Sequence, residues 1–206
     1  MHENVAERGI GEYLEALGGT DSMPGGGSAA GIVGALAAAT AQMMASLTRE
    51  QSPELIAAKD KLVELRARAL ECASDDEKSY GGYLDALSLP KSTDEEKSAR
   101  KSQLAASLEA SARVPLALAV VGVEIVDVLD AVIRDGNKTV LGDAESAIVM
   151  AMATVDVCEI NVRANLKFIK DESLANSLQE SISAAKELIV HLAAERRAQI
   201  EKRRSE

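Results

Sequence analysis

Two segments of the chain carry residue types that could do acid–base chemistry on a bound ligand. The first covers residues 75–91, where a helix would place Asp76, Tyr80, Tyr83 and Leu87 on one face. A carboxylate beside tyrosines on a half-apolar face has its pKa raised by desolvation, as a general acid requires. The same spacing also fits an ordinary solvated acidic cluster whose tyrosines pack inward.

The second segment is a proline–glycine turn at residues 24–28. Its three consecutive glycines, Gly25, Gly26 and Gly27, lose more chain entropy on ordering than any other residue type would. Such a run is expected where a ligand or a second helix must approach the backbone closely. Ser28 stands where a helix N-cap would be, and free N–H groups there would face an anionic or polar group.

Several kinds of catalytic site are disfavoured by what the sequence lacks. Only two histidines are present, His2 and His191, so neither a Ser-His-Asp triad nor a histidine-ligated metal is expected. The glycine run fits neither the phosphate-binding nor the dinucleotide-binding spacing, and it follows no strand. Proton transfer would therefore fall to Asp, Glu, Lys or Tyr.

The composition is typical of an acidic helical protein. Of 206 residues, 47% are hydrophobic but only 2% aromatic, and a core of Ala, Leu, Val and Ile favours packed helices. The net charge of −10 argues against a nucleic-acid-binding surface and against a basic membrane-surface helix. Cys72 and Cys158 give no disulfide framework, and the polar amino terminus lacks the apolar core of a signal peptide. We therefore expect a cytoplasmic location.

We expect one all-α domain over residues 1–206, built as a bundle of long helices. Pro53 opens a long helix in which residues 81–82 mark a kink, a break or a close crossing. Thr93 with Glu96 reads as a capping box for the next helix, which Pro115 kinks or divides. The uncharged span 22–48 is long enough to cross a membrane, but its glycine, alanine and polar residues favour a buried central helix. The helices expected are 3–17, 28–48, 53–89, 93–134, 143–170 and 172–203.

These segments, taken in order, resemble the cyclodeaminase domain of formiminotransferase-cyclodeaminase and its stand-alone relatives, the methenyltetrahydrofolate cyclohydrolases. The resemblance extends from about residue 10 to residue 170. No single motif is specific, but the ordered set is. Its landmarks are residues 24–28 (PGGGS), 76–80 (DEKSY), 89–91 (LPK), 93–97 (TDEEK), 113–116 (RVPL), 136–137 (GN), 142–144 (GDA) and 161–166 (NVRANL).

The resemblance implies an all-helical homodimer that acts, without a cofactor or metal, on the one-carbon bridge of a tetrahydrofolate derivative, polyglutamylated forms included. In the cyclohydrolase reaction water attacks the methenyl carbon and the ring opens to formyltetrahydrofolate. In the cyclodeaminase reaction the anilino nitrogen attacks the formimino carbon, and ammonia leaves to give methenyltetrahydrofolate. Both reactions pass through a tetrahedral carbon that bears an amine, and both need one group to move a proton.

Asp76 matches the family's catalytic acid/base, and Asp75 is the competing candidate if the register slips by one. Two departures from the family pattern bear on the site. Relatives often carry small residues where this chain has residues 77–79 (EKS), and many have a serine in place of Gly142. The extra charges beside Asp76 make its pKa hard to infer from sequence.

The resemblance also supplies the candidate substrate-binding residues, which are Gly25, Gly26, Gly27, Ser28, Tyr80, Lys91, Asn137, Asp143, Asn161 and Asn165. Asp143 fits an N-cap equally well. Asn161 and Asn165, four residues apart, suit either the edge of a pterin or the tying of a buried turn. Asp143 and Asn161 would lie about 27 Å apart on one helix, so they could share a pocket only across a dimer interface or if the helix breaks.

Basic residues have two interpretations. Lys91 either stabilises a charged group of the folate or is an idle surface lysine. Arg49 and the group of Lys97, Arg100 and Lys101 either meet the glutamate tail of the folate or form a solvated charged face.

The leading hypothesis is thus a folate one-carbon enzyme, and the lack of a transferase domain in this sequence favours the cyclohydrolase. The alternative is a non-catalytic helical scaffold or dimerisation module of the same fold.

Overall fold

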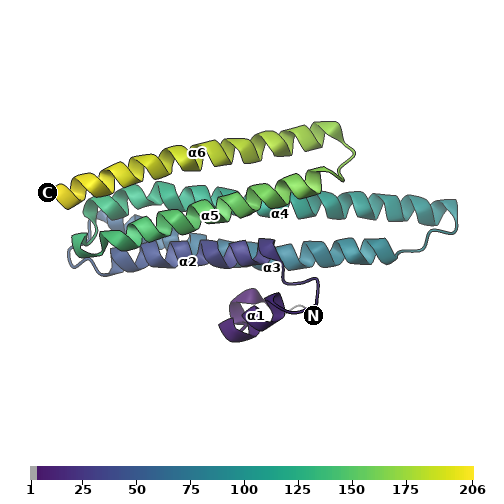
Figure 1. The fold of residues 1–206 in the computed structure, drawn as a ribbon, viewed down its shortest axis with the longest axis horizontal. Helices are drawn as coiled ribbons and strands as arrows, with labels where there is room; N and C mark the ends of the chain where they lie inside the picture. The colour runs from purple at the N-terminus through teal and green to yellow at the C-terminus, as the bar shows by residue number, and fades with distance from the viewer. Residues whose placement is uncertain (1–3) are drawn as a thin grey trace.

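A computed structural model of the chain describes residues 4–206, and it consists of helices joined by short turns (Figure 1). No strand occurs in these residues, which confirms the all-α prediction. Two short 3-10 helices, η1 (Val5–Glu7) and η2 (Lys138–Val140), accompany the α-helices. The α-helices are α1 (Ile10–Leu17), α2 (Gly26–Ser46), α3 (Pro53–Ser88), α4 (Asp94–Asp135), α5 (Leu141–Leu166) and α6 (Glu172–Ser205).

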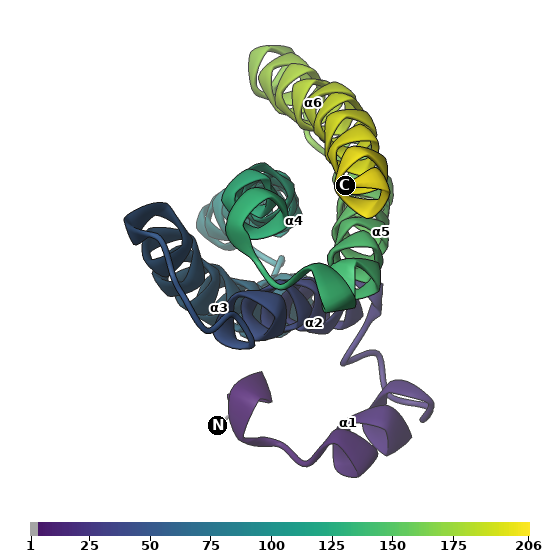
Figure 2. The ribbon, with the colours of Figure 1, turned by 90° about the vertical axis from the view of Figure 1, so that its left-hand side faces the viewer.

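The central helix of the bundle is α4. It packs against α2, α3, α5 and α6, and these four helices curve around it when the molecule is viewed end-on (Figure 2). Aliphatic side chains fill the core, among them the fully buried Leu65, Ile125, Ile148 and Ile189. A core of this composition explains why the chain can do with so few aromatic residues, because burial of aliphatic carbon supplies most of the stabilisation.

Small residues let α2 and α3 approach each other closely. A Cβ atom added to Gly31 of α2 would lie 2.7 Å from both the carbonyl oxygen of Ala69 and the Cβ of Ala73 on α3. None of the described glycines has a positive φ angle, so a left-handed backbone does not require them. Glycine is needed here for space, because a residue without a Cβ lets the two helix backbones approach this closely.

Beyond α2 and α5, the second half of α3 and the first half of α4 extend as a two-helix arm, residues 80–110 (Figure 1). Local signals set the helix boundaries in this region. At the start of α3, Ser52 Oγ accepts a hydrogen bond from the Leu55 N–H at 3.1 Å, and Pro53 occupies the first helical position. Thr93 and Glu96 form the predicted capping box at the start of α4.

No break occurs at residues 81–82 or at Pro115, and residues 81–82 instead mark a close crossing of α3 with α4, one of the alternatives predicted for them. The helix α3 runs on through Gly82, whose carbonyl accepts a hydrogen bond from Ser107 Oγ of α4 at 3.2 Å, and α4 is not divided at Pro115. A proline has no N–H to offer the carbonyl four residues earlier, here that of Ser111. Asn165 Nδ2 of α5 donates to that carbonyl at 2.8 Å instead. Because this acceptor is satisfied from outside the helix, α4 can continue through the proline.

Residues 4–17 lie beside the paired helices α2 and α3 (Figure 1). The single helix predicted for residues 3–17 is instead η1 followed by α1, and residues 2 and 3 fall outside the described part of the chain. Tyr13 anchors this segment, since it is buried with Val5 against Ala73 of α3. On the outer face of α1, Ile10 and Leu14 are exposed.

The helix α2 is long and apolar enough to cross a membrane, judged by length and composition. In the structure 56% of its most apolar window is buried within the bundle. The helix is thus partly buried, as predicted, but the central position in the bundle belongs to α4 and not to α2.

Candidate active site

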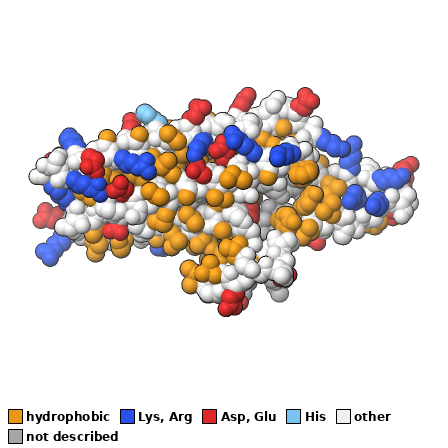
Figure 3. Space-filling model, viewed as in Figure 1, with side chains coloured by type: hydrophobic (Ala, Val, Ile, Leu, Met, Phe, Trp, Pro, Cys, Tyr) orange, Lys and Arg blue, Asp and Glu red, His pale blue; other side chains and the backbone are white. Residues whose placement is uncertain are grey.

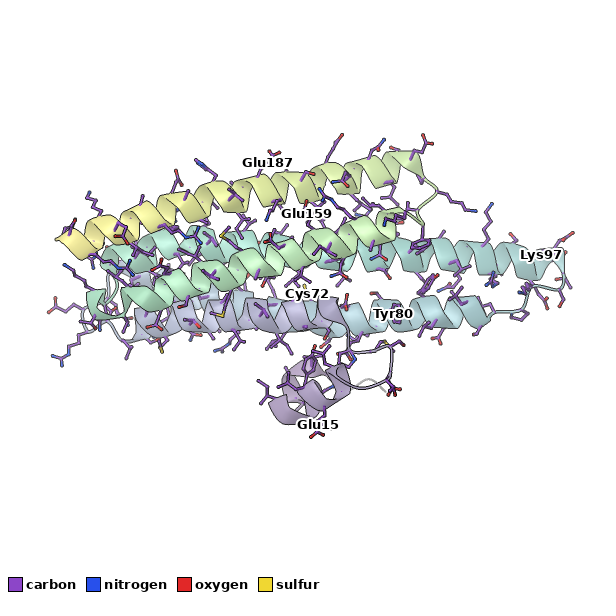
Figure 4. All side chains as sticks on the ribbon, viewed as in Figure 1. Glu15, Cys72, Tyr80, Lys97, Glu159 and Glu187 are labelled. Atoms are coloured by element: carbon purple, nitrogen blue, oxygen red, sulfur yellow. The ribbon has the colours of Figure 1, made fainter. Side chains whose placement is uncertain are left out.

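Asp76 lies where α3 crosses the first turn of α2. A Cβ atom added to Gly27 would overlap the Asp76 carboxylate, lying only 2.7 Å from Oδ2. Cys72 and Tyr80, one turn before and one turn after Asp76, mark this level of α3 in Figure 4. A Cβ atom on Gly25 or Gly26, by contrast, would meet nothing within 4 Å. Gly27 thus makes room for the Asp76 carboxylate, and there is open space beside Gly25 and Gly26.

The surroundings of Asp76 raise its pKa. Burial has the largest effect, because desolvation disfavours the charged carboxylate. The backbone N–H of Ser28 hydrogen-bonds the carboxylate and lowers the pKa, whereas the negative charge of Glu77 raises it. Asp75, the competing candidate, instead pairs with Lys78 at 2.9 Å and is 43% exposed. A carboxyl group with a raised pKa suits general acid–base catalysis, so the geometry favours Asp76 over Asp75.

Ser28 is not the N-cap of α2, contrary to the sequence-based prediction. The N-cap is Gly25, and the helix begins at Gly26. Ser28 Oγ instead donates a hydrogen bond to Glu77 Oε1 at 3.0 Å and accepts one from Tyr13 Oη at 3.0 Å. The serine hydroxyl bonds a residue of another helix and not the backbone of α2, because Glu77 of α3 lies within hydrogen-bonding distance.

Asn161 lies at the same level of the bundle as the glycine run. The helix α5 runs antiparallel to α2, as two hydrogen bonds show: Asn137 Nδ2 donates to the Leu47 carbonyl at 3.3 Å, and Thr154 Oγ1 donates to the Ala30 carbonyl at 3.4 Å. Asn161 follows Thr154 by two turns on the same side of α5. This register carries Asn161 towards the first turn of α2.

Asn165 ties two helices together, which is one of the two roles predicted for it. Its Nδ2 satisfies the Ser111 carbonyl that Pro115 leaves without a helical partner. The amide is therefore committed to the backbone of α4.

The role of Asn165 predicts a coupling between two substitutions. Asn165→Ala should lower the free energy of unfolding by about 1–3 kcal/mol, because it leaves a buried carbonyl unsatisfied. In a Pro115→Ala background the new N–H can serve that carbonyl, and the same Asn165→Ala change should cost clearly less. Urea unfolding of the four proteins measures the coupling. Equal costs in the two backgrounds would contradict it.

Tyr80 connects the level of Asp76 to a cleft on the arm. Its ring centroid lies 6.3 Å from that of Tyr83, and Tyr83 lines a cavity of about 940 Å³. Tyr83 lies seven residues after Asp76 on α3, a rise of about 10 Å. The cavity lies between the arm and the α5–α6 turn, and its apolar lining residues include Leu87, Leu104, Leu108, Phe168, Ile169 and Leu174.

The rim of this cleft is basic although the chain is acidic. Its lining cations are Lys91, Lys97, Arg100, Lys101 and Lys170, against the two acidic residues Glu109 and Asp171. Both acids are engaged: Glu109 pairs with Arg113 at 2.7 Å, and Asp171 caps α6. In Figure 3 basic side chains surround an apolar patch at the end of the molecule that carries the arm. The Nε of Arg100 is buried there without a hydrogen-bond partner among the described residues.

Asn137, Asp143 and Arg49 are not brought to Asp76 within one chain. All three lie at the end of the bundle where α2 ends, and the 21 residues of α2 separate that end from the glycine run by about 30 Å. Asn137 caps η2. Asp143 is not an N-cap, because α5 begins at Leu141 and places Asp143 within its first turn. Nor does α5 break, so Asp143 and Asn161 stay apart.

Sequence reasoning missed three contributors to this region. Arg8 and Tyr13 reach the site from the N-terminal segment, and Lys170 reaches the cleft from the α5–α6 turn. None of them has a local sequence signal. Among the described residues, no three His, Cys, Asp or Glu side chains converge as metal ligands. Cys158 of α5 is buried, and burial raises its pKa far above the usual range.

The chain is similar to proteins of known function over most of its length. A family model described as formiminotransferase-cyclodeaminase matches residues 9–184. A methenyltetrahydrofolate cyclohydrolase of Methylorubrum extorquens is 34% identical over 169 residues, which cover 79% of this chain and 81% of the relative. A formimidoyltransferase-cyclodeaminase of Gallus gallus is 28% identical, and the match covers 88% of this chain but 35% of that protein.

A solved structure has the same fold. The crystal structure of formiminotetrahydrofolate cyclodeaminase from Thermotoga maritima superposes with a TM-score of 0.85 at 24% identity, covering 96% of this chain and 98% of that one. The match of the family model to most of the chain, together with the relative at 34% identity, confirms the resemblance drawn from the ordered motifs. The chain belongs to the formiminotransferase-cyclodeaminase family.

Proposed function

We propose that this chain is a folate one-carbon enzyme that acts on the carbon bridging the two folate nitrogens, with Asp76 as its general acid/base. The observation that carries the proposal is the half-buried Asp76 carboxylate, which has a raised pKa and lies over Gly27 beside open space. Membership of the family supplies the substrate class. The reactions need only nucleophilic attack at the bridging carbon and proton transfer at oxygen and nitrogen, so the proposal includes no cofactor.

In the cyclohydrolase reaction Asp76 acts first as a base and then as an acid. Water attacks the cationic methenyl carbon, and the ionised carboxylate takes the proton that the water loses. The product is a tetrahedral carbon that bears a hydroxyl and two nitrogens. The protonated Asp76 then returns its proton to the departing nitrogen, the carbon–nitrogen bond breaks, and the hydroxyl oxygen becomes the formyl carbonyl with loss of its proton to solvent. A raised pKa keeps the return of the proton favourable.

The cyclodeaminase reaction would use the same side chain. The anilino nitrogen of the protonated formimino substrate attacks the formimino carbon and loses its proton to the Asp76 carboxylate. Asp76 then gives that proton to the amino group, the carbon–nitrogen bond to it breaks, and it leaves as ammonia. We favour the cyclohydrolase, because the relative of that name is 34% identical and matches over 81% of its own length. The formimidoyltransferase-cyclodeaminases are 28% identical and match over 35% of theirs, and the Thermotoga maritima cyclodeaminase, which matches over 98% of its length, is 24% identical.

A comparative assay tests the proposal. Purified protein is mixed with methenyltetrahydrofolate, and the loss of near-ultraviolet absorbance is followed. Separately, formiminotetrahydrofolate is supplied and ammonia is measured. We expect turnover in the first assay. Turnover only in the second would make the protein a cyclodeaminase, and turnover in neither would favour the non-catalytic scaffold.

We also propose that the basic cleft holds the glutamyl tail of a polyglutamylated substrate. Its cations complement a chain of carboxylates, and its apolar floor suits the benzoyl group that precedes them. The rise of about 10 Å from Asp76 to Tyr83 is of the size expected between the reacting carbon and the start of the tail.

Removing two of these cations should discriminate between substrates. In Lys97→Gln/Lys101→Gln we expect KM to rise about tenfold for a polyglutamyl substrate, with little change for the monoglutamyl form and no change in kcat. The contrast should shrink at high salt, because both lysines are solvent-exposed. Lys138→Gln, at the opposite end of the bundle, is the matched control. An equal rise in KM for both substrates would show that the glutamyl tail does not bind in the cleft.

We propose a homodimer as well. Apolar side chains are exposed along α2 and α5, notably Leu36, Met43, Val149 and Ile160. A second copy of this chain would bury them, since exposed apolar patches mark association sites. Sedimentation at micromolar concentration would show a monomer if the proposal is wrong.

A further inference from the structure

A chain of buried polar contacts joins the N-terminal segment to the catalytic level of α3. Glu77, the residue after Asp76, is 3% exposed. Arg8 grips both of its carboxylate oxygens, with Nη1 donating to Oε1 at 3.2 Å and Nη2 donating to Oε2 at 2.7 Å. Ser28 Oγ donates a hydrogen bond to Oε1 at 3.0 Å and accepts one from Tyr13 Oη at 3.0 Å. A pair with this bidentate geometry is rigid as well as strong.

Ser28 makes the connection to Asp76. Its hydroxyl bonds Glu77, and its backbone N–H bonds the Asp76 carboxylate. The first turn of α2 is therefore fastened to two consecutive carboxylates of α3. When Glu77 is held in place, the N–H that contacts Asp76 is held in place too.

The N-terminal segment is itself fixed to α3 around this contact. The Val5 N–H donates to Ser74 Oγ at 3.1 Å, and Ser74 Oγ donates to Asn4 Oδ1 at 3.1 Å. Tyr13 packs into a small apolar cluster with Val5 and Ala73. Arg8 thus reaches Glu77 from a segment with its own anchors on both sides.

We propose that the Arg8–Glu77 ion pair is a positioning device for Asp76, by which residues 4–17 set the geometry and charge balance of the acid/base. Asp76 has its catalytic role only under the proposed function, on which this inference depends. The negative charge of Glu77 disfavours the ionised form of the neighbouring Asp76 carboxyl, and the positive charge of Arg8 offsets it. The Arg8–Glu77 ion pair explains why this chain can carry a glutamate directly after Asp76, where relatives often carry a small residue.

Among the described residues, the other groups in the network around Asp76 carry no charge at working pH, and Arg8 and Glu77 do. Tyr13 contacts the network from α1, and burial raises its pKa, so it stays neutral at working pH. Cys158 faces the region from α5, and burial raises its pKa also. Ser28 of α2 has no charge. Removing either member of the ion pair should therefore move the titration of Asp76 in a direction set by the charge that is lost.

The test compares Glu77→Gln, Arg8→Gln and the double variant with the wild type. The pH titration of the Asp76 carboxyl is followed by ¹³C NMR in aspartate-labelled protein, with the resonance assigned by its loss in Asp76→Asn. We expect the midpoint to fall in Glu77→Gln, to rise in Arg8→Gln and to return towards the wild type in the double variant. The rising limb of kcat/KM against pH should move in the same directions, and kcat should fall about tenfold in each single variant.

Two further readouts keep the outcome interpretable. Arg8→Lys retains the charge but cannot bridge both oxygens, so we expect a midpoint near that of the wild type with a lowered kcat; circular dichroism reports folding in every variant. Folded single variants whose Asp76 midpoints equal that of the wild type would overturn the inference. The NMR titration does not require turnover. An inactive wild-type protein would therefore contradict only the proposed function, and the titration would still decide whether the ion pair controls the charge of Asp76.

Discussion

Asp76→Asn is expected to lower turnover of methenyltetrahydrofolate at least about 100-fold, which is the loss typical of a missing general acid/base. Asparagine keeps the shape of the side chain and can still accept the Ser28 N–H bond. It can neither take a proton from water nor return one to nitrogen. Asp75→Asn is the matched control, because Asp75 is a neighbouring carboxylate that pairs with Lys78 on the surface. Activity near that of the wild type in Asp76→Asn, or an equal loss in both variants, would move the acid/base elsewhere.

Asp76→Asn should also stabilise the protein relative to the wild type, by an amount that increases with pH. Burial raises the pKa of Asp76 above the ordinary value of 3.8, so the folded protein binds its proton more tightly than the unfolded chain does. Stability from such a group is fully present below the unfolded pKa and is lost as pH rises through the folded pKa. The asparagine variant lacks this loss. Thermal or urea unfolding from pH 4 to pH 8 should therefore show the variant gaining on the wild type with increasing pH.

A gain in stability together with a loss of activity would separate the catalytic explanation from a simple folding defect. If Asp76 were only a structural residue in a favourable environment, its replacement would destabilise the protein across this pH range. The pH series therefore tests the raised pKa independently of any folate assay.

Signals within one or two helical turns are read reliably from this sequence. Pro53 and the Thr93–Glu96 capping box set helix starts through contacts between near neighbours, and the structure has both. Asp76 and the glycine run were also singled out from sequence, because three glycines in a row and a carboxylate among tyrosines are unusual patterns. The contact between Asp76 and the glycine run was not predicted, because it depends on how α2 crosses α3.

The errors arise where a tertiary partner outcompetes a local one. Ser28 does not cap α2 because its hydroxyl donates a hydrogen bond to Glu77, which is 49 residues away in the sequence. Pro115 does not divide α4 because Asn165, on another helix, satisfies the carbonyl that the proline frees. Periodicity within one helix contains no information on either partner.

Asn137 and Asp143 illustrate a different limit. Their place in an ordered set of motifs assigned them to the substrate site, although helix geometry already put Asp143 about 27 Å from Asn161 within one chain. Order along the chain is not proximity in a bundle of long helices. The antiparallel course of α2 and α5 carries Asn161 to the glycine run and leaves the other two at the opposite end.

Gly27→Ala is expected to lower both the stability of the fold and the turnover of the enzyme. The added Cβ would overlap the Asp76 carboxylate, which must move or force α2 away from α3. Overpacking of this kind costs about 1–3 kcal/mol, more than the roughly 0.5–1 kcal/mol that alanine gains over glycine in a helix. We therefore expect a net loss of stability. A displacement of the carboxylate by about 1 Å would also lower kcat by up to about 100-fold.

Gly26→Ala is the matched control, because its Cβ would meet nothing within 4 Å. It is expected to keep the stability of the wild type or gain slightly, and its effect on KM reports whether substrate occupies the open space beside the turn. Gly27→Ala combined with Asp76→Ala completes the comparison. With the carboxylate removed, the methyl group has room, so the glycine substitution should cost nothing or stabilise in that background. A cost that persists without the Asp76 side chain would mean that Gly27 serves the helix crossing alone, and that its contact with the carboxylate is incidental.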